Sequence, residues 1–352
     1  MNSNLKKIFS ILLFPFTYLY QFMFFLDQKF TKKKKIDNSL VLSIGNLTLG
    51  GSGKTPFTMY MVKLLNRLGK KNITVLSRGY GGTKSNEGMK VELESSPLEC
   101  GDEPLLLKKN YPEIEVIIGK NRFQSFQKFS SRKDLKESII LLDDGFQHHA
   151  LDRDYDFVLV DSLKGLGNGR TIPAGFLREK KSALSRADFL IFTKVNSDTL
   201  NNVNRMKEEW MLEFPNLKFF EFSFIPIRLV NLEGESFNPE FLFNKKVLAF
   251  CGIAKPESFF SIVKTLKPKT LETRIFSDHA NYSLNQIFGI MEEASSFDLV
   301  LCTEKDIVKV SRMNLFTESK SKIYSLHNEV RMKNEEDFES LMSEIIQKKF
   351  NY

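Results

Sequence analysis

Residues 50–55 combine a glycine-rich turn with a lysine and a hydroxyl side chain, a pattern typical of a phosphate-binding loop. In such a loop backbone N–H groups point at phosphate oxygens, and the helix that follows adds its positive end. We expect Lys54 to contact the β- and γ-phosphates, and the Thr55 hydroxyl to ligate Mg²⁺. Thr48 departs from the general motif, which has glycine there. The predicted nucleotide-binding residues of this loop are Thr48, Gly50, Gly51, Ser52, Gly53, Lys54 and Thr55.

A second chemical pattern is an apolar run that ends in Asp143 and Asp144. Nucleotide-binding α/β proteins hold Mg²⁺ with an aspartate at the end of a strand, directly or through water. The pattern is weak by itself because many strands end in aspartate. Together with the upstream glycine loop it predicts the metal side of a nucleotide site.

Two further pairs carry groups that move protons. Asp102 and Glu103 follow a glycine and could supply a general base and a metal contact for an attacking hydroxyl. Taken alone, the start of a helix is the commoner use of such a pair. Asp278 and His279 form a second pair, in which the imidazole could orient a base or shift its pKa, although such pairs are more often structural.

Arginines recur in glycine-containing loops, around Arg78, Arg122, Arg170 and Arg178. Arginine suits phosphate recognition because its planar fork matches phosphate oxygens. Each of these loops alone is also consistent with a surface contact or an ion pair.

The elements that would position these residues are short apolar runs separated by helix-length segments, the pattern of a parallel sheet covered by helices on both faces. Ligands collect at the carboxyl ends of such strands. The predicted strands are 40–44, 73–76, 116–118, 139–142, 157–160, 189–192, 247–250 and 298–302. A helix is expected from Lys54 to Leu68, stopped by Gly69.

The domain organisation follows from composition changes along the chain. A segment rich in proline, glycine and scattered charges, 222–244, predicts a boundary. We expect a hydrophobic anchor and its basic flank at 1–35, a P-loop domain at 36–230, and a smaller α/β domain at 231–352. The tail from Lys320 to Tyr352 is charged and helical in pattern.

Composition narrows the possible partners. The 352 residues carry a net charge of +8, which fits nucleic acid, anionic lipid or a phosphorylated substrate. The excess is largely local to the lysines at 29–35, beside an apolar segment, and no nucleic-acid motif appears. Cys100, Cys251 and Cys302 lack close pairing or metal-ligand spacing, so we expect a reduced compartment and buried free thiols.

The N-terminal segment from Ile8 to Leu26 carries no charge and approaches the roughly 20 residues that span a bilayer. Its proline, tyrosines and glutamine favour a half-inserted or in-plane anchor, and a spanning helix stays open as an alternative. A cleaved signal peptide is disfavoured because no small-residue cleavage site follows. The lysines that follow are expected to attract anionic headgroups.

Taken together, these segments resemble the tetraacyldisaccharide 4′-kinase family, the lipid A 4′-kinases. The matching motifs run in family order over nearly the whole chain. They are 45–48, 76–81, Gly101 to Pro104, Asp143 to His148, Arg153-Asp154, 167–170, 173–175, 177–179 and Thr303 to Asp306. The family shares Thr48, but it often has a second histidine in place of Ala280 and a proline in place of Phe176.

The resemblance implies a phosphotransferase that uses ATP and Mg²⁺ to phosphorylate the 4′-hydroxyl of a tetraacyldisaccharide 1-phosphate, giving lipid IVA in lipid A biosynthesis. It implies an enzyme at the cytoplasmic face of the inner membrane, and neither a nucleic acid nor an obligate protein partner is inferred. By matching motif, Asp102 would be the catalytic base, paired with His279 across the domain cleft, with Lys54 also catalytic. The remaining implied residues are Thr55, Glu103, Asp143 and Asp144 for the metal, Gln147 and His148 beside the nucleotide, and Arg78, Arg122, Asn168 and Arg170 for substrate.

Two other functional classes remain as alternatives. One is a membrane-associated regulatory GTPase or assembly ATPase. Thr193 to Asn196 follows a predicted strand and faintly resembles a guanine-reading loop, but both end residues differ from that motif. The net charge of +8 suggests a nucleic-acid binder. Nucleotide preference with acceptor-dependent turnover, and salt-dependent DNA binding, would separate these classes from a kinase.

Overall fold

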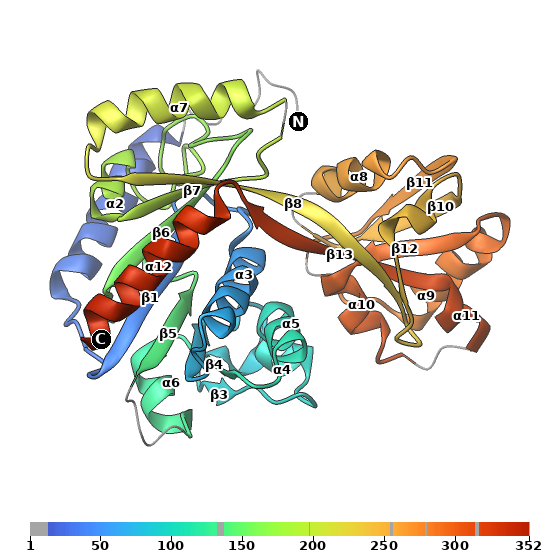
Figure 1. Cartoon of the computed structure of the whole chain (residues 1–352), viewed down its shortest axis with the longest axis horizontal. Coiled ribbons are helices and arrows are strands. Elements are labelled where there is room, and N and C mark those ends of the chain that lie inside the picture. Colours follow the sequence, from blue (N-terminus) through green and yellow to red (C-terminus); the bar gives the residue numbers. More distant parts are fainter. Residues whose placement is uncertain are drawn as a thin grey trace.

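One mixed sheet runs through the whole molecule. The computed structural model describes residues 13–131, 137–196, 198–253, 256–278, 280–313 and 317–351. Within these ranges, 13 strands form a continuous sheet in which most neighbours are parallel. Figure 1 shows this sheet crossing from a larger lobe into a smaller one. The predicted α/β class with a largely parallel sheet is therefore confirmed.

Among the described residues, the part of the sheet in the larger lobe has seven neighbouring strands that are parallel to one another. A short strand that pairs antiparallel forms its edge. In spatial order the strands are β3 (Met89–Lys90), β4 (Glu115–Ile118), β2 (Ile73–Ser77), β5 (Ser138–Asp143), β1 (Ser39–Asn46), β6 (Tyr155–Asp161), β7 (Phe189–Thr193) and β8 (Lys218–Asn231). Strands β1, β2 and β5 are buried at every position, which explains their continuous apolar sequence. The six strands predicted between residues 40 and 192 are all present.

Helices cover both faces of this part of the sheet. On one face, α3 inserts Phe57, Met61 and Leu65 into the principal core, and on the other Trp210 of α7 packs against Phe192. The helical segments here are α3 (Lys54–Arg67), η1 (Thr83–Ser85), α4 (Pro97–Cys100), α5 (Asp102–Asn110), α6 (Arg122–Phe129), η2 (Lys181–Arg186) and α7 (Leu200–Glu213). The predicted helix after the glycine loop is confirmed as α3.

The smaller lobe continues the sheet with parallel strands and helices on both faces. The parallel strands are β10 (Lys246–Cys251), β11 (Thr270–Ile275) and β12 (Leu299–Thr303), and the short β9 (Ser236–Phe237) pairs antiparallel with β8. Its helical segments are η3 (Pro239–Leu242), α8 (Pro256–Thr265), α9 (Leu284–Glu293), η4 (Ala294–Ser296), α10 (Glu304–Val310) and α11 (Thr317–Lys322). Cys100, Cys251 and Cys302 are buried and free, as expected.

Two long strands join the lobes. Strand β8 pairs with β7 through its first residues and then antiparallel with β13 (Ile323–Met332). The helical pattern expected from Lys320 onward is therefore wrong for 323–332, because pairing with β8 outweighs local propensity. Residues 222–231 of the predicted boundary are the second half of β8, and Pro226, which lacks an N–H donor, lies at the irregularity in this ladder.

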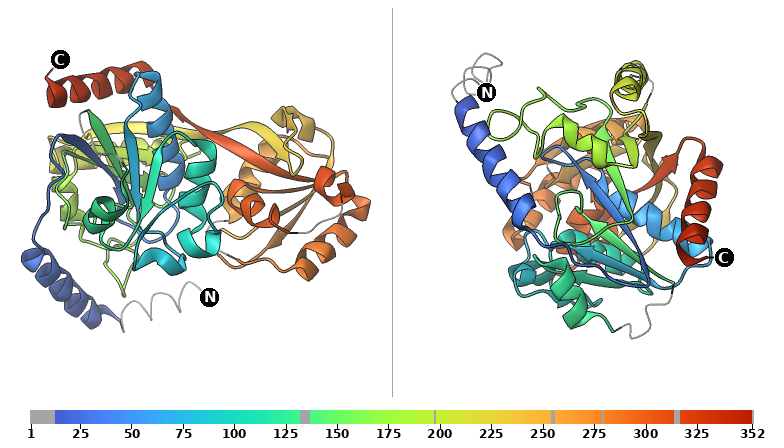
Figure 2. Two further views of the ribbon diagram at one scale, coloured as in Figure 1. Left: turned by 90° about the horizontal axis from the view of Figure 1, so that it is seen from below. Right: turned by 90° about the vertical axis from the view of Figure 1, so that its left-hand side faces the viewer.

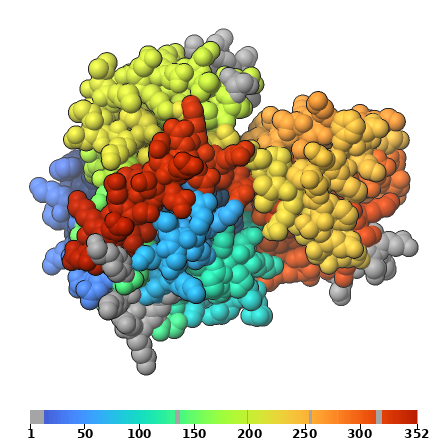
Figure 3. All heavy atoms as spheres, in the orientation of Figure 1, coloured from blue at the N-terminus to red at the C-terminus, as the bar shows by residue number. Residues whose placement is uncertain are grey.

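Helix α12 (Glu335–Phe350) returns the chain to the larger lobe. Its Phe338 is fully buried against Phe57 and Phe157, and Met342 and Ile346 join the same core. Figures 2 and 3 show α12 on the surface of this lobe, beside α3. The division into 36–230 and 231–352 stays a prediction, and the packing places α12 with the larger lobe.

The N-terminal helix α2 (Phe14–Phe30) lies on the side of the larger lobe opposite α12 (Figure 2). Residues 1–12, which include the first part of the predicted anchor, lie outside the described residues. In the part of the chain that is described, no helix combines the length and the apolar character needed to cross a bilayer.

Candidate active site

The glycine loop lies between β1 and α3, at the carboxyl edge of the parallel strands. Gly50 and Gly53 adopt positive φ angles of 101° and 88°, which side chains with a Cβ rarely adopt. A Cβ at Gly53 would also lie 3.0 Å from the Phe224 ring. The Ser52 hydroxyl is buried and has no hydrogen-bond partner among the described residues. The sequence therefore forms the tight loop that phosphate binding requires.

Lys54 and Thr55 begin α3 and face carboxylates from other elements. Lys54 Nζ lies 3.4 Å from Asp144 Oδ1 and donates to Asn46 Oδ1, also at 3.4 Å. The Thr55 hydroxyl donates to Glu103 Oε2 at 2.6 Å. The structure thus brings the predicted phosphate-binding and metal-binding residues to one place.

Asp143 ends β5 and is fully buried in this cluster. The hydroxyls of Thr58 and Ser77 donate to its carboxylate at 3.3 and 3.2 Å. Burial, followed by the negative charges of Glu103 and Asp144, raises the pKa of Asp143 to about 6. Asp143 is therefore harder to ionise than an aspartate in water.

Asp144 has the opposite electrostatic environment although it is adjacent in sequence. Arg178 Nη1 donates to both of its carboxylate oxygens at 2.9 Å. Burial alone would raise the pKa of Asp144, but Lys54 and Arg178 outweigh it and lower the value to about 2. Asp144 is therefore held ionised beside the lysine of the glycine loop.

Asp102 and Glu103 form the first turn of α5, and Gly101 rather than either acid is the N-cap. Glu103 is paired with Lys305 of the smaller lobe, and Asp102 Oδ2 lies 2.8 Å from Lys309 Nζ. Burial would raise the pKa of Glu103, but Lys305, Thr55 and Lys54 lower it to about 2. Both acids of α5 therefore face lysines of the smaller lobe, and Glu103 is held ionised.

The smaller lobe also directs Asp278 toward this cluster. Burial lowers the pKa of Lys305, but the charges of Glu103, Asp102 and Asp278 outweigh it and raise that pKa. Asp278 thus lies within electrostatic range of Lys305, the partner of Glu103. His279 lies outside the described residues, so its pairing with Asp102 stays a prediction.

Arg122 and His148 flank the Asp144 side of the site. Arg122 Nη2 donates to the Asp144 backbone carbonyl at 3.4 Å, and Nη1 lies 3.4 Å from His148 Nδ1. Burial, together with Arg122 and further cations that include Arg78, lowers the pKa of His148 to about 3. His148 is therefore neutral at physiological pH, and Arg78 lies close enough to influence it.

Gln147 and Thr48 support the loop around the site. Gln147 Nε2 donates to the Asn46 carbonyl at 3.0 Å and to Glu179 at 3.1 Å. The backbone of Thr48 forms an isolated bridge with Leu177. These contacts connect the glycine loop to the segment that carries Arg178.

Asn168 and Arg170 lie apart from the cluster. Asn168 Nδ2 donates to the Ala174 carbonyl at 3.0 Å within its own loop. The Arg170 guanidinium lies 5.0 Å from the centroid of the Phe14 ring of α2. The Arg170 contact joins the N-terminal helix to the lobe, and the role of both residues in substrate binding stays a prediction.

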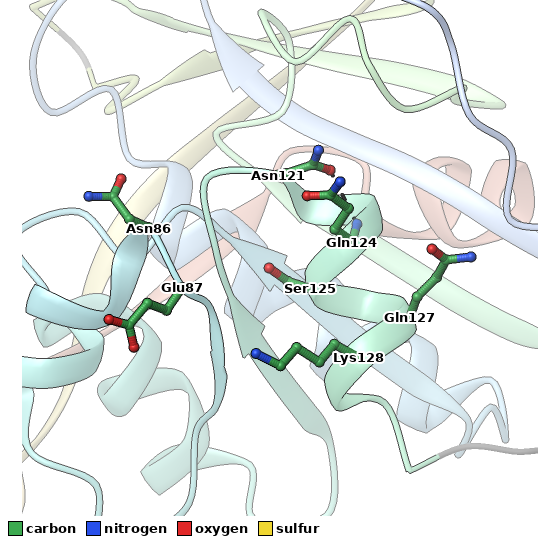
Figure 4. A pocket seen from close by; sticks show the side chains of 7 residues that line it. All are labelled: Asn86, Glu87, Asn121, Gln124, Ser125, Gln127 and Lys128. Atoms are coloured by element: carbon green, nitrogen blue, oxygen red, sulfur yellow. Dashed lines mark hydrogen bonds between the residues drawn. The ribbon is translucent and has the colours of Figure 1, made fainter.

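A surface cavity beside α6 does not coincide with this cluster. It has a volume of about 480 Å³ and separates Asn86 and Glu87 from polar side chains of α6 (Figure 4). None of the described candidate residues lines it. The polar cluster, and not this cavity, defines the candidate site.

The family comparison agrees with this geometry. The family described as tetraacyldisaccharide-1-P 4′-kinase matches residues 9–347. The chain belongs to this family. A tetraacyldisaccharide 4′-kinase of Leptospira biflexa is 36% identical over 97% of this chain and 96% of its own length. The enzyme of the same name from Halothermothrix orenii is 31% identical over 97% of this chain and 91% of its own length.

A solved structure extends the comparison to three dimensions. The crystal structure of the "apo" form of LpxK from Aquifex aeolicus in complex with ATP has a TM-score of 0.73 and 29% sequence identity. The match covers 96% of this chain and 99% of that one. Membership of a kinase family disfavours the regulatory GTPase, and Lys194 of the faintly similar loop instead donates to the Gly51 carbonyl at 3.2 Å and to Asp161.

Two residues at the site of this family member received no role from the sequence, Lys305 and Lys309, whereas Arg178 was expected only among the loop arginines suited to phosphate. Lys305 lies within a matching motif, and that position was its only signal. Lys309 lies one helical turn after Lys305 on α10, so both project from one face. Their acidic partners are far away in sequence, which is why spacing could not reveal the pairs.

Proposed function

We propose that this chain transfers the γ-phosphate of ATP to the 4′-hydroxyl of a tetraacyldisaccharide 1-phosphate, yielding lipid IVA for lipid A biosynthesis. The observation that carries the proposal is the convergence of Lys54, Thr55, Glu103 and Asp143–Asp144 at one strand edge. Phosphoryl transfer requires positioning and charge neutralisation more than covalent chemistry by the protein. Family membership supports both the donor and the acceptor.

Mg²⁺ fits the side chains of this site. Thr55, Glu103 and Asp143 offer oxygen donors, which this ion prefers. Burial and then the charges of Glu103 and Asp144 raise the pKa of Asp143, and a cation bound here would offset that negative charge. The described residues contain no preformed group of three or more histidines, cysteines or acids able to hold a metal, so phosphate oxygens and water would complete the shell. When bound, Mg²⁺ would neutralise charge on the β- and γ-phosphates.

The other roles in phosphoryl transfer belong to residues of the chain itself. Backbone N–H groups of residues 50–53 and the Lys54 ammonium orient the transferred phosphate. The Asp102 carboxylate accepts the proton of the attacking 4′-hydroxyl. Arg178 and Lys54 hold Asp144 ionised beside the nucleotide. The P-loop nucleotide-binding architecture of the larger lobe is part of this proposal.

We further propose that the enzyme works on the cytoplasmic face of the inner membrane. A tetraacylated substrate leaves a bilayer at a cost of about 0.8 kcal/mol per CH₂ group, whereas ATP is cytosolic. Large apolar side chains of α2 are exposed, with Phe22 and Met23 58% and 62% accessible, whereas Tyr20 and Gln21 hydrogen-bond to the lobe. Exposed lysines at 32–35 follow the helix and suit anionic headgroups.

The test is a transfer assay with detergent-solubilised protein, ATP labelled at the γ-phosphate, Mg²⁺ and tetraacyldisaccharide 1-phosphate. We expect label in the lipid with the wild type, and a loss of about 100-fold or more with Asp102→Ala. ATP hydrolysis without labelled lipid would retain the nucleotide site and overturn the lipid acceptor. Full transfer by Asp102→Ala would retain the acceptor and overturn the base.

A further inference from the structure

Two lysines of the smaller lobe meet two adjacent acids of the larger lobe. Lys305 and Lys309 are separated by four residues on α10, and they pair with Glu103 and Asp102 respectively. The Lys309–Asp102 pair is deeply placed, because the two side chains are 8% and 11% exposed. Solvent therefore screens this ion pair far less than a surface pair.

Lys309 makes a second contact that Lys305 does not share. Its Nζ donates to the Ala280 backbone carbonyl at 2.9 Å while lying 2.8 Å from Asp102 Oδ2. Ala280 belongs to the loop of Asp278 and follows His279 directly in the sequence. One ammonium group thus connects the predicted base to the loop that carries its predicted partner.

A buried network fixes the helix that presents Lys309. Asp306 is fully buried and accepts hydrogen bonds from Tyr282 at 2.7 Å, Thr303 at 2.6 Å and the Gly252 backbone N–H at 3.2 Å. Tyr282 follows the Asp278 loop in the sequence, so its hydrogen bond to Asp306 holds this loop against α10. A Cβ at Gly252 would lie 2.9 Å from the Tyr282 hydroxyl, which makes glycine necessary at this close approach.

We propose that Lys309 is a positioning residue for phosphoryl transfer, which holds the Asp102 carboxylate and the Ala280 loop in one arrangement across the two lobes. The proposal rests on the proposed function, in which Asp102 accepts the proton. Lys305 differs because its partner Glu103 also contacts Thr55 and is an expected metal ligand. Asp102 has no such metal role in the proposal, so it keeps Lys309 as its cation during turnover.

The experiment measures kcat and KM for ATP and for lipid acceptor with the full-length protein in the transfer assay. Lys309→Met removes both contacts, and Lys309→Gln keeps an N–H donor without the charge. We expect kcat to fall about 100-fold in both, because a small misplacement of a reacting group has effects of that size. KM for ATP should change less than about threefold, since Lys309 does not touch the glycine loop, and Lys309→Arg should recover most of kcat.

Lys264→Met on α8 is the matched control, because Lys264 is exposed and lies on the same lobe. It should retain wild-type kcat. Thermal unfolding identifies any variant that fails to fold, and Lys309→Gln then replaces Lys309→Met. The single-turnover rate of the double variant Asp102→Asn, Lys309→Met should be less than about threefold below that of Asp102→Asn alone. The effects of substitutions at residues that act as a unit are not additive.

The outcomes separate the two proposals. A wild type that phosphorylates no tetraacyldisaccharide 1-phosphate overturns the proposed function itself. An active wild type with unchanged kcat in folded Lys309→Met and Lys309→Gln overturns only the positioning role. A raised KM for acceptor at unchanged kcat would also overturn it, because Lys309 would then contribute to substrate binding alone.

Discussion

At the residue scale, two neighbouring aspartates receive opposite environments. Asp143 points into a buried pocket of hydroxyls and acids, whereas Asp144 points toward Lys54 and Arg178. Their pKa values of about 6 and about 2 follow from this geometry. Identical side chains therefore offer different chemistry. Ionised Asp143 would be stabilised by a bound cation, whereas Asp144 is already ionised at neutral pH by its own cationic partners.

Asp143→Asn should stabilise the protein free of metal and nucleotide near neutral pH. The folded-state pKa of Asp143 lies above its unfolded value of about 3.8, so the wild type loses stability as pH rises from about 4 to about 6. The variant avoids this loss, and we expect a gain of about 2–3 kcal/mol at pH 7.5 that shrinks toward pH 4.5. Urea unfolding at the two pH values measures the difference.

Asp152→Asn provides the control, because Asp152 is exposed on the surface of the same lobe. Its stability should equal that of the wild type at both pH values. Equal stability of Asp143→Asn and wild type at pH 7.5 would show that Asp143 is not destabilised by ionisation. With saturating Mg-ATP, the wild type should become more stable than Asp143→Asn, because the asparagine cannot provide a charged ligand to the metal.

At the element scale, helix α2 contacts the lobe through polar side chains and exposes large apolar side chains to solvent. Its Tyr20 donates to the Arg178 carbonyl at 2.9 Å, and Gln21 donates to the Thr171 hydroxyl at 2.8 Å. The opposite side exposes large apolar side chains, among them Leu19 at 57% and Phe25 at 54%. The helix thus holds the segment that carries Arg178 while presenting an apolar surface outward.

Replacing Phe22 and Met23 of α2 by serine should weaken membrane binding while leaving the fold intact. Both side chains are more than half exposed, so their removal leaves no cavity in the lobe. We expect at least a tenfold loss of sedimentation with vesicles of anionic phospholipid, since each apolar side chain contributes about 1.5–3 kcal/mol when buried.

Leu212→Ser is the matched control, because Leu212 is 88% exposed on α7. It should leave vesicle binding unchanged. Undiminished binding of the Phe22→Ser, Met23→Ser protein would contradict the proposed contact between α2 and the membrane.

At the scale of the whole molecule, the chain connects its lobes twice. It leaves the larger lobe along β8 and returns along β13, and α12 then completes the core that α3 began. In sequence, the smaller lobe therefore lies between two segments that both pack in the larger lobe. This arrangement places α10 opposite α5, where the two lysine–acid pairs form.

Phe338→Ala should destabilise the larger lobe although it lies near the C-terminus. Its ring is fully buried and contacts Phe57, Phe157 and Phe220. We expect a loss of about 3–5 kcal/mol in the free energy of unfolding, typical of a buried phenylalanine replaced by alanine. Chemical unfolding monitored by the single tryptophan of α7 reports this lobe.

Phe243→Ala, at a position that is 64% exposed, should change the same quantity by less than about 0.5 kcal/mol. An equally small effect of Phe338→Ala would show that α12 is not an integral part of the core.

The sequence by itself determined the local features of this protein. Continuous apolar runs predicted the buried strands, since a strand covered on both faces needs apolar residues throughout. The glycine loop, Asp143 and Asp144 were recognisable because strand, turn and helix are contiguous, and the ordered motifs indicated the family. Tertiary structure alone decided the pairing of β8 with β13, the return of α12, the outward orientation of α2, and the contacts of Lys305 and Lys309. These depend on contacts between distant segments, whose partners neither local propensity nor residue spacing specifies.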